Sequence, residues 1–174
     1  MTRAHLLLAL APLVAPLSAA ADCVGETLVS CPVDDRRRLE VCLDPGAPAS
    51  EPAFTYAFGP PGAPELTLRA PLSDGTVTPW NGVGRSLWES VAFNSGAHVY
   101  EVWHAFDRLT PDAPLEAGVN VLRGDDLLAS LTCRPGPETQ IAPIFALSDA
   151  MTDAGWRRDL DAGVWRPTDQ APAD

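Results

Sequence analysis

Residues 86–106 read SLWESVAFNSGAHVYEVWHAF, and this stretch decides the fold class of the chain. Two runs within it, 86–93 and 98–106, alternate apolar residues with polar or small ones, as half-buried strands do. The four residues between the runs are Asn94, Ser95, Gly96 and Ala97, which are typical of a hairpin turn. The stretch therefore predicts two antiparallel strands joined by a tight turn.

The same pattern recurs on both sides of this hairpin, where Pro and Gly residues divide the chain into further short alternating runs. We expect strands at 26–31, 38–43, 53–58, 65–70, 118–122 and 127–133. Together with the central pair they make eight strands in four successive hairpins, and no helical periodicity interrupts them before residue 140. The sequence thus predicts an all-β domain over residues 22–133, an eight-stranded antiparallel barrel or barrel-like sandwich.

The segment 134–174 lacks the short alternating runs of the preceding part, and we expect a C-terminal helical tail there. Ser148 is suited to cap a short helix that continues to about Ala154, with Gly155 at its end. Beyond it, large apolar residues alternate with arginines; these residues are Trp156, Arg157, Arg158, Leu160, Trp165 and Arg166. Two interpretations are open, because the tryptophans could cover one opening of the β domain or dock in a groove of a partner.

The first 21 residues predict a secretory signal peptide. A charged start with Arg3 is followed by the apolar run Leu6–Leu17 and then by small residues up to Ala21. The run is too short for a membrane-spanning helix, and no later stretch is long enough to be one. A lipid anchor on Cys23 is the alternative, which the acidic Asp22 disfavours. We therefore expect a periplasmic or secreted protein.

All four cysteines follow the leader, which favours two disulfides in an oxidising compartment. If residues 33–38 form the bend of a hairpin, Cys31 and Cys42 fall symmetrically about it and could face each other across two strands. That pairing leaves Cys23 to join Cys133. The expected bonds are therefore Cys31–Cys42 and Cys23–Cys133.

Charge restricts the kinds of partner. The whole chain of 174 residues has a formal charge of −11, every cation other than histidine is arginine, and removal of Arg3 with the leader gives −12. Such a field repels phosphate, so we expect no nucleic acid as a partner. A basic protein would instead be attracted to it.

The residues offer little for catalysis, and we expect neither an enzyme, nor a cofactor, nor a metal site. His98 and His104 share one face of a predicted strand about 20 Å apart, too far to hold one ion, and a place at the surface or rim is the simpler interpretation for both. No Gly-x-Ser-x-Gly motif is present, and the cysteines are expected to be paired. The acid pairs Asp34-Asp35 and Asp125-Asp126 are most simply solvated turn residues, and the Asp-Asp-Arg-Arg-Arg run at 34–38 is most simply a turn that neutralises its own charge.

Aromatic and arginine side chains near the predicted loops are better candidates for a function, because these types are enriched where proteins bind one another. Core or wall positions are the alternative for the aromatic ones. The group comprises Trp80, Arg85, Trp88, Tyr100, Trp103 and Arg123.

The segment 23–133 resembles a group of small uncharacterised secreted proteins of Gram-negative bacteria, a resemblance that implies no particular activity. The motifs that carry it are Val29-Ser-Cys31, Val41-Cys42, Tyr56-Ala-Phe-Gly59, Glu65-Leu66, Trp80-Asn-Gly-Val-Gly-Arg85, Tyr100-Glu-Val102, Ala117-Gly-Val119 and Leu131-Thr-Cys133.

A second resemblance is to the periplasmic inhibitors of C-type lysozyme, which are small eight-stranded barrels. Their Ser-Gly-x-x-Tyr turn is similar to Ser95-Gly96-Ala-His-Val-Tyr100, and Arg123-Gly124 stands where they have Lys-Gly. The resemblance implies a binding surface that comprises Ser95, Gly96, Tyr100 and Arg123, to which the residues add Trp80 and Arg85.

We therefore expect a monomeric, non-enzymatic binding or inhibitor module that contacts a basic protein such as a lysozyme. The alternative is a structural or accessory protein of the cell envelope that docks through its aromatic and arginine-rich tail.

Overall fold

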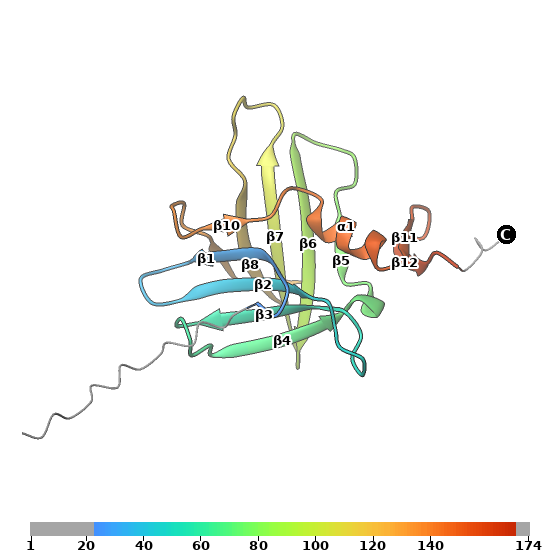
Figure 1. Cartoon of the computed structure of the whole chain (residues 1–174). Helices are drawn as coiled ribbons and strands as arrows, with labels where there is room; N and C mark the ends of the chain where they lie inside the picture. The colour runs from blue at the N-terminus through green and yellow to red at the C-terminus, as the bar shows by residue number, and fades with distance from the viewer. Residues whose placement is uncertain (1–22, 170–174) are drawn as a thin grey trace, which may run out of the picture.

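The computed structural model describes residues 23–169 and shows two five-stranded antiparallel sheets packed face to face (Figure 1). Sheet 1 has the order β10 (Gln140–Ile141), β1 (Glu26–Pro32), β2 (Arg38–Asp44), β3 (Ala53–Gly59) and β4 (Leu66–Pro71). Sheet 2 has the order β5 (Val77–Pro79), β6 (Ser86–Ser95), β7 (His98–Asp107), β8 (Glu116–Arg123) and β9 (Asp126–Thr132). The strands of one sheet run across those of the other (Figure 1), an arrangement known from orthogonal sheet packings.

The eight predicted strands are all present, as the hairpins β1–β2, β3–β4, β6–β7 and β8–β9. The all-β prediction is thus confirmed. Within residues 23–169 no strand pairing joins the two sheets into a closed barrel. The sequence did not indicate the short strands β5 and β10, nor the two-stranded sheet formed by β11 (Trp156–Asp159) and β12 (Val164–Pro167).

The core lies between the two sheets and follows the predicted alternation. Leu39, Val41 and Phe54 of sheet 1 are fully buried, and so is Phe93 of sheet 2. The Tyr56 ring centroid is 5.3 Å from that of Phe93, so aromatic side chains of opposite sheets pack together. Full burial of one such side chain contributes about 1.5–3 kcal/mol, and this layer is the main source of stability.

The predicted disulfide pairing is wrong, because the bonds are Cys23–Cys42 and Cys31–Cys133, with Cα atoms 5.6 and 5.5 Å apart. The β1–β2 turn is shorter than expected and is centred on Asp35. Cys31 therefore lies opposite Leu39, while Cys42 lies opposite Thr27 at the far end of the hairpin. There Cys42 meets Cys23, which lies three residues before β1 begins at Glu26.

The same turn neutralises part of its own charge, through Asp34 and Arg37, whereas Asp35 and Arg38 pair with residues of the segment after β9. The Asp34 carboxylate accepts backbone N–H bonds from Arg36 and Arg37 at 2.9 and 2.7 Å and pairs with the Arg37 guanidinium at 2.6 Å. These hydrogen bonds, that of Arg36 first, lower the pKa of Asp34 to about 2.

The segment after residue 133 is part of the fold. β10 pairs with β1, and helix α1 (Ala146–Asp153) and the β11–β12 hairpin follow. The helix begins earlier than predicted, so Ser148 lies within its first turn rather than at the cap. Trp165 is buried and donates its indole N–H to the Val77 carbonyl of β5 at 2.9 Å, whereas Leu160 is exposed. At least Trp165 therefore covers the β domain.

The predicted leader, residues 1–21, lies outside the described residues. Across residues 23–169 there is no helix of the length and apolarity that crossing a bilayer requires. The two disulfides are typical of proteins exposed to an oxidising compartment.

Candidate functional site

Three of the predicted binding residues lie together at one end of sheet 2. Ser95 and Gly96 form the β6–β7 turn, where Gly96 has the left-handed φ of +58° that favours glycine. Arg123 ends β8 beside this turn, and its Nη2 lies 2.9 Å from Nε2 of His98, which is paired with Ser95. The structure thus places Arg123 next to the Ser95–Gly96 turn, as expected.

Tyr100 lies on β7, two residues after His98, but its side chain points toward the core. Its ring centroid is 5.7 Å from that of Tyr56 on sheet 1, and the side chain packs against the buried core. Tyr100 therefore joins the two sheets rather than extending the surface at the turn.

Trp80 and Arg85 lie at the opposite end of sheet 2. Both precede Ser86, the first residue of β6, whereas the turn at Ser95 follows its last; a strand of this length spans about 30 Å. Trp80 donates its indole N–H to the Val83 carbonyl at 2.9 Å, and Arg85 pairs with Asp107. This pairing, above all its hydrogen bond, holds the pKa of Asp107 well below its usual range. The predicted residues therefore do not form one surface.

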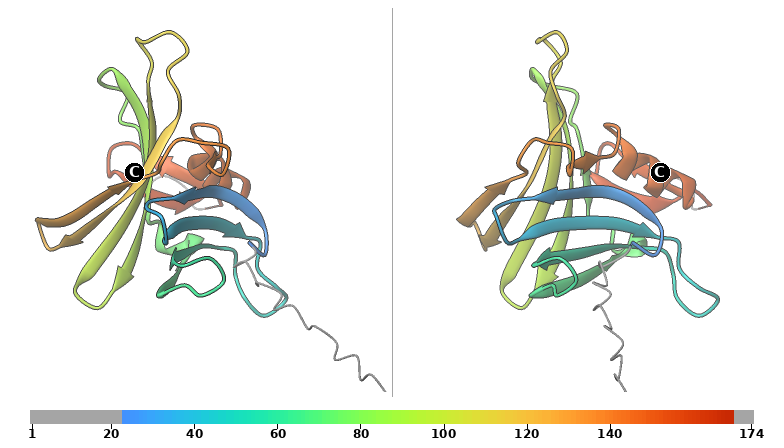
Figure 2. Two further views of the ribbon diagram at one scale, coloured as in Figure 1. Left: turned by 90° about the vertical axis from the view of Figure 1, so that its left-hand side faces the viewer. Right: turned by 60° about the vertical axis from the view of Figure 1, so that its left-hand side comes forward.

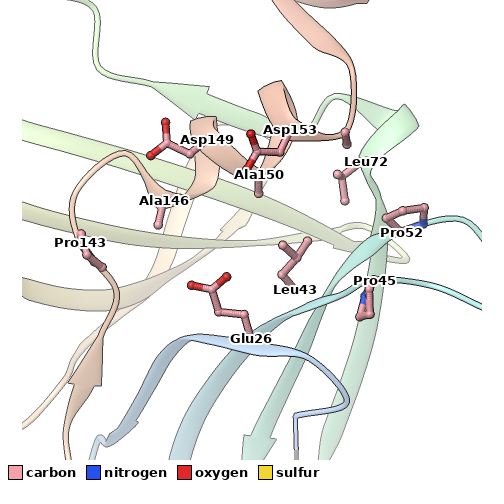
Figure 3. A pocket seen from close by; sticks show the side chains of 11 residues that line it. Glu26, Leu43, Pro45, Pro52, Leu72, Pro143, Ala146, Asp149, Ala150 and Asp153 are labelled. Carbon is pink, nitrogen blue, oxygen red and sulfur yellow. The ribbon is translucent and has the colours of Figure 1, made fainter.

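A groove of about 390 Å³ lies between α1 and the end of the β1–β2 hairpin (Figure 3). Its apolar part comprises prolines, alanines and two leucines, and its polar part is three carboxylates. The lining residues are Glu26, Leu43, Pro45, Pro52, Leu72, Pro143, Ala146, Asp149, Ala150, Asp153 and Ala154. The volume is of the size that holds one or two amino-acid side chains or a small ligand.

The charges of the groove have one sign. Glu26 extends from β1 on one wall, and Asp149 and Asp153 extend from α1 on the other (Figure 3). No lining residue is basic, and within residues 23–169 these three carboxylates have no hydrogen-bond or ion-pair partner. The groove can therefore hold a cationic group together with apolar carbon atoms.

A buried glutamate fixes the helix that forms one wall of the groove. Phe145 at the N-cap supplies no side-chain hydrogen bond, so the first amides of α1 need another acceptor. Glu89 of β6, which is fully buried, accepts N–H bonds from Leu147 at 3.0 Å and from Ser148 at 3.3 Å. Its oxygen atoms thus lie at the N-terminal end of the helix, where acceptors are favourable.

The surroundings of Glu89 are closed to substrates. His104 lies opposite Glu89 on β7, with Nε2 3.5 Å from the carboxylate, and is 1% exposed. The expected surface or rim position of His104 is therefore wrong, because the row that it shares with Tyr100 faces the core. Nδ1 of His104 and Oγ of Ser148 have no hydrogen-bond partner in the described part of the chain. The arrangement anchors α1.

Metal ligands do not gather in the part of the chain that the structure describes, where no group of three or more His, Cys, Asp or Glu side chains could hold an ion. His98 and His104 lie on one face of β7, as predicted, with Tyr100 between them.

Comparison of the chain with models of protein families, with curated proteins and with solved structures found no match. The candidate site consequently rests on the residues themselves.

Sequence reasoning missed the groove because its residues come from five separate segments. The Asp149 and Asp153 pair was visible as acids four residues apart in a predicted helix, which share one helix face. Nothing in the sequence indicated that Glu26 would stand opposite them.

Proposed function

We propose that this protein is a non-enzymatic binding module of the periplasm or the cell exterior, and that its groove holds a basic segment of a partner protein. One observation carries the proposal, namely an apolar groove edged by three carboxylates that have no partner within residues 23–169. An arginine or lysine side chain matches it, because its carbon stem is apolar and its head is cationic.

The charge of the whole molecule supports the same class of partner. A formal charge of −12 after removal of the leader accelerates association with a basic protein and opposes an acidic one. C-type lysozymes are basic proteins of the cell exterior, so a role similar to that of their periplasmic inhibitors suits both the charge and the expected compartment.

In this proposal the contact surface differs from the one first expected. Ser95, Gly96 and Arg123 lie at one end of sheet 2, where Arg123 is held against His98. No apolar groove edged by unpartnered carboxylates is described there within residues 23–169. The groove beside α1 is the better match for a cationic segment.

The experiment is a titration of the mature protein with a C-type lysozyme at low salt, read by calorimetry and by the rate of cell-wall lysis. We expect binding and slower lysis. The triple variant Glu26→Gln, Asp149→Asn, Asp153→Asn should bind about tenfold or more weakly, since each rim charge contributes up to about 1 kcal/mol.

The matched control is Glu65→Gln, Asp112→Asn, Glu116→Gln, which removes the same charge from exposed positions away from both the groove and the β6–β7 turn. It should retain most of the affinity. Equal weakening in both triple variants would show that net charge alone acts, and unchanged lysis with no heat of binding would contradict a lysozyme as the partner.

A further inference from the structure

Within residues 23–169 no other helix or sheet covers the outer face of sheet 2 (Figure 2). Val91, Val102 and Val119 share a row that points to the core, so the residues between them along β6, β7 and β8 point outward. Trp88 and Trp103 belong to this outward set. This face is separate from the groove beside α1, which lies on the other side of sheet 2.

The Trp103 side chain reaches over the neighbouring strand β8. Its partner on β8 is Gly118, and a Cβ atom at Gly118 would stand 2.8 Å from Cζ2 and 3.0 Å from Cε2 of the indole. The same Cβ atom would stand 2.4 Å from the Leu131 carbonyl oxygen of β9, so both the backbone of β9 and the indole require a glycine at this position. The indole is half-buried and therefore keeps part of its surface open to solvent.

A row of hydrogen-bonded polar side chains crosses four strands beside this ring. Ser90 of β6 donates to Glu101 of β7 at 3.1 Å, Asn120 of β8 donates to the other oxygen of Glu101 at 3.3 Å, and Ser130 of β9 donates to Asn120 at 2.9 Å. Glu101 and Asn120 are direct cross-strand partners, next but one along the strands from Trp103 and Gly118.

Both the ring and the polar row retain hydrogen-bonding capacity. Within residues 23–169 the indole N–H groups of Trp88 and Trp103 have no acceptor. A carboxylate accepts about four hydrogen bonds, and the Glu101 carboxylate receives two, while the Asn120 amide has a second N–H. The face therefore offers an apolar platform with donors and acceptors along its side.

The chemistry of the face selects the class of ligand. None of the residues of β6–β9 that share this face is Lys or Arg, so an anion has no counter-charge. A purely apolar ligand would bury the remaining acceptors of Glu101 and the second N–H of Asn120 without partners, which is unfavourable. A sugar ring has an apolar C–H face and hydroxyl groups around its edge, and so matches both parts.

We propose that the outer face of sheet 2 binds a neutral saccharide, with one pyranose ring stacked on Trp103 and its hydroxyl groups hydrogen-bonded to Glu101 and Asn120. The row of polar side chains across four strands favours an extended chain of sugars over a single one. This site is independent of the groove and of its proposed function.

The experiment is a titration of the mature protein with the tetrasaccharides of β-1,4-linked glucose and of β-1,4-linked N-acetylglucosamine, followed by tryptophan fluorescence and by amide NMR shifts. We expect saturable binding of at least one tetrasaccharide, with shifts centred on Glu101, Trp103, Gly118 and Asn120. Trp103→Ala should weaken this binding about tenfold or more, because it removes the stacking platform.

Two further variants keep the test decisive. Glu101→Gln preserves the size of the side chain and should leave the fold unchanged while it weakens binding severalfold. This variant tests the proposal even if Trp103→Ala fails to fold. Trp80→Ala removes a tryptophan from the loop before β6 and should bind as the wild type does. The proposal is overturned if neither tetrasaccharide shifts any amide of this face at about 10 mM, or if Trp80→Ala weakens binding as much as Glu101→Gln.

Discussion

The buried side chain of Glu89 positions α1, which forms one wall of the groove. Its carboxylate lies in the core of sheet 2, yet its hydrogen bonds go to Leu147 and Ser148, about sixty residues further along the chain. A buried carboxylate is unfavourable unless it is well hydrogen-bonded, so the position of α1 and the burial of Glu89 depend on each other.

Replacing this carboxylate should destabilise the protein strongly. We predict that Glu89→Ala lowers the free energy of unfolding by about 2–4 kcal/mol, because two helix amides and His104 lose their partner inside the core. Glu89→Gln keeps one acceptor and should cost less. Urea unfolding measures both, with Glu116→Ala on β8 as an exposed control expected to change stability by less than about 0.5 kcal/mol. A loss no greater than that of the control would contradict the anchoring role.

Asp34 gives a prediction about acid conditions. Its pKa is lowered to about 2, so its hydrogen bonds stabilise the folded protein above the ordinary pKa of 3.8 and are lost as the pH falls through about 2. The variant Asp34→Asn lacks this titration. Its free energy of unfolding should fall less steeply between about pH 4 and pH 2 than that of the wild type, and equal slopes in acid-series urea unfolding would contradict the assignment.

At the scale of elements, the long strands were predictable and the short ones were not. Alternation over six to ten residues, bounded by Pro and Gly, indicates a strand by itself, as in β6 and β7. β10 has two residues and β11 and β12 have four each, too few to show a period, so their pairing depends on tertiary contacts. The disulfide pairing failed for a related reason, since a small error in the centre of the β1–β2 turn changes which residues face each other.

The groove could not be predicted in the same way. Its carboxylates are ordinary surface residues in the sequence, and only the placement of α1 against β1 brings Glu26 opposite Asp149. That placement depends on Glu89, which occupies a core position of an alternating strand where an apolar residue is the usual choice.

Removal of the tail should damage the fold. A chain that ends at residue 133 loses the buried side chains Leu147, Met151 and Trp165 and leaves Glu89 without its helix amides. We predict that it aggregates or unfolds at least about 10 °C lower than the mature protein, whereas a chain that ends at residue 169 keeps these contacts and its melting temperature. A truncated protein that melts with the mature protein and stays monomeric would contradict this.

At the scale of the whole molecule, one disulfide joins residues close in sequence and the other joins the two sheets. Cys23–Cys42 closes a separation of 19 residues within one sheet, whereas Cys31–Cys133 closes 102 residues and ties sheet 1 to the end of β9 in sheet 2. A longer closed loop restricts the unfolded chain more strongly.

The long-range bond should therefore matter more for stability. We predict that the double variant Cys31→Ala, Cys133→Ala loses about 1.5 kcal/mol more than Cys23→Ala, Cys42→Ala, from chain entropy alone. Chemical unfolding of both double variants measures the difference, after peptide mapping under non-reducing conditions has verified the two bonds. A larger loss for the short-range pair would contradict the ranking.

The groove beside α1 is the place where we propose that a basic partner binds. The most direct test is to record amide NMR shifts of the mature protein while a C-type lysozyme is added. We expect the largest shifts on Glu26, Leu43 and the residues of α1. Shifts confined to the β6–β7 turn and Arg123, with none along α1, would contradict it.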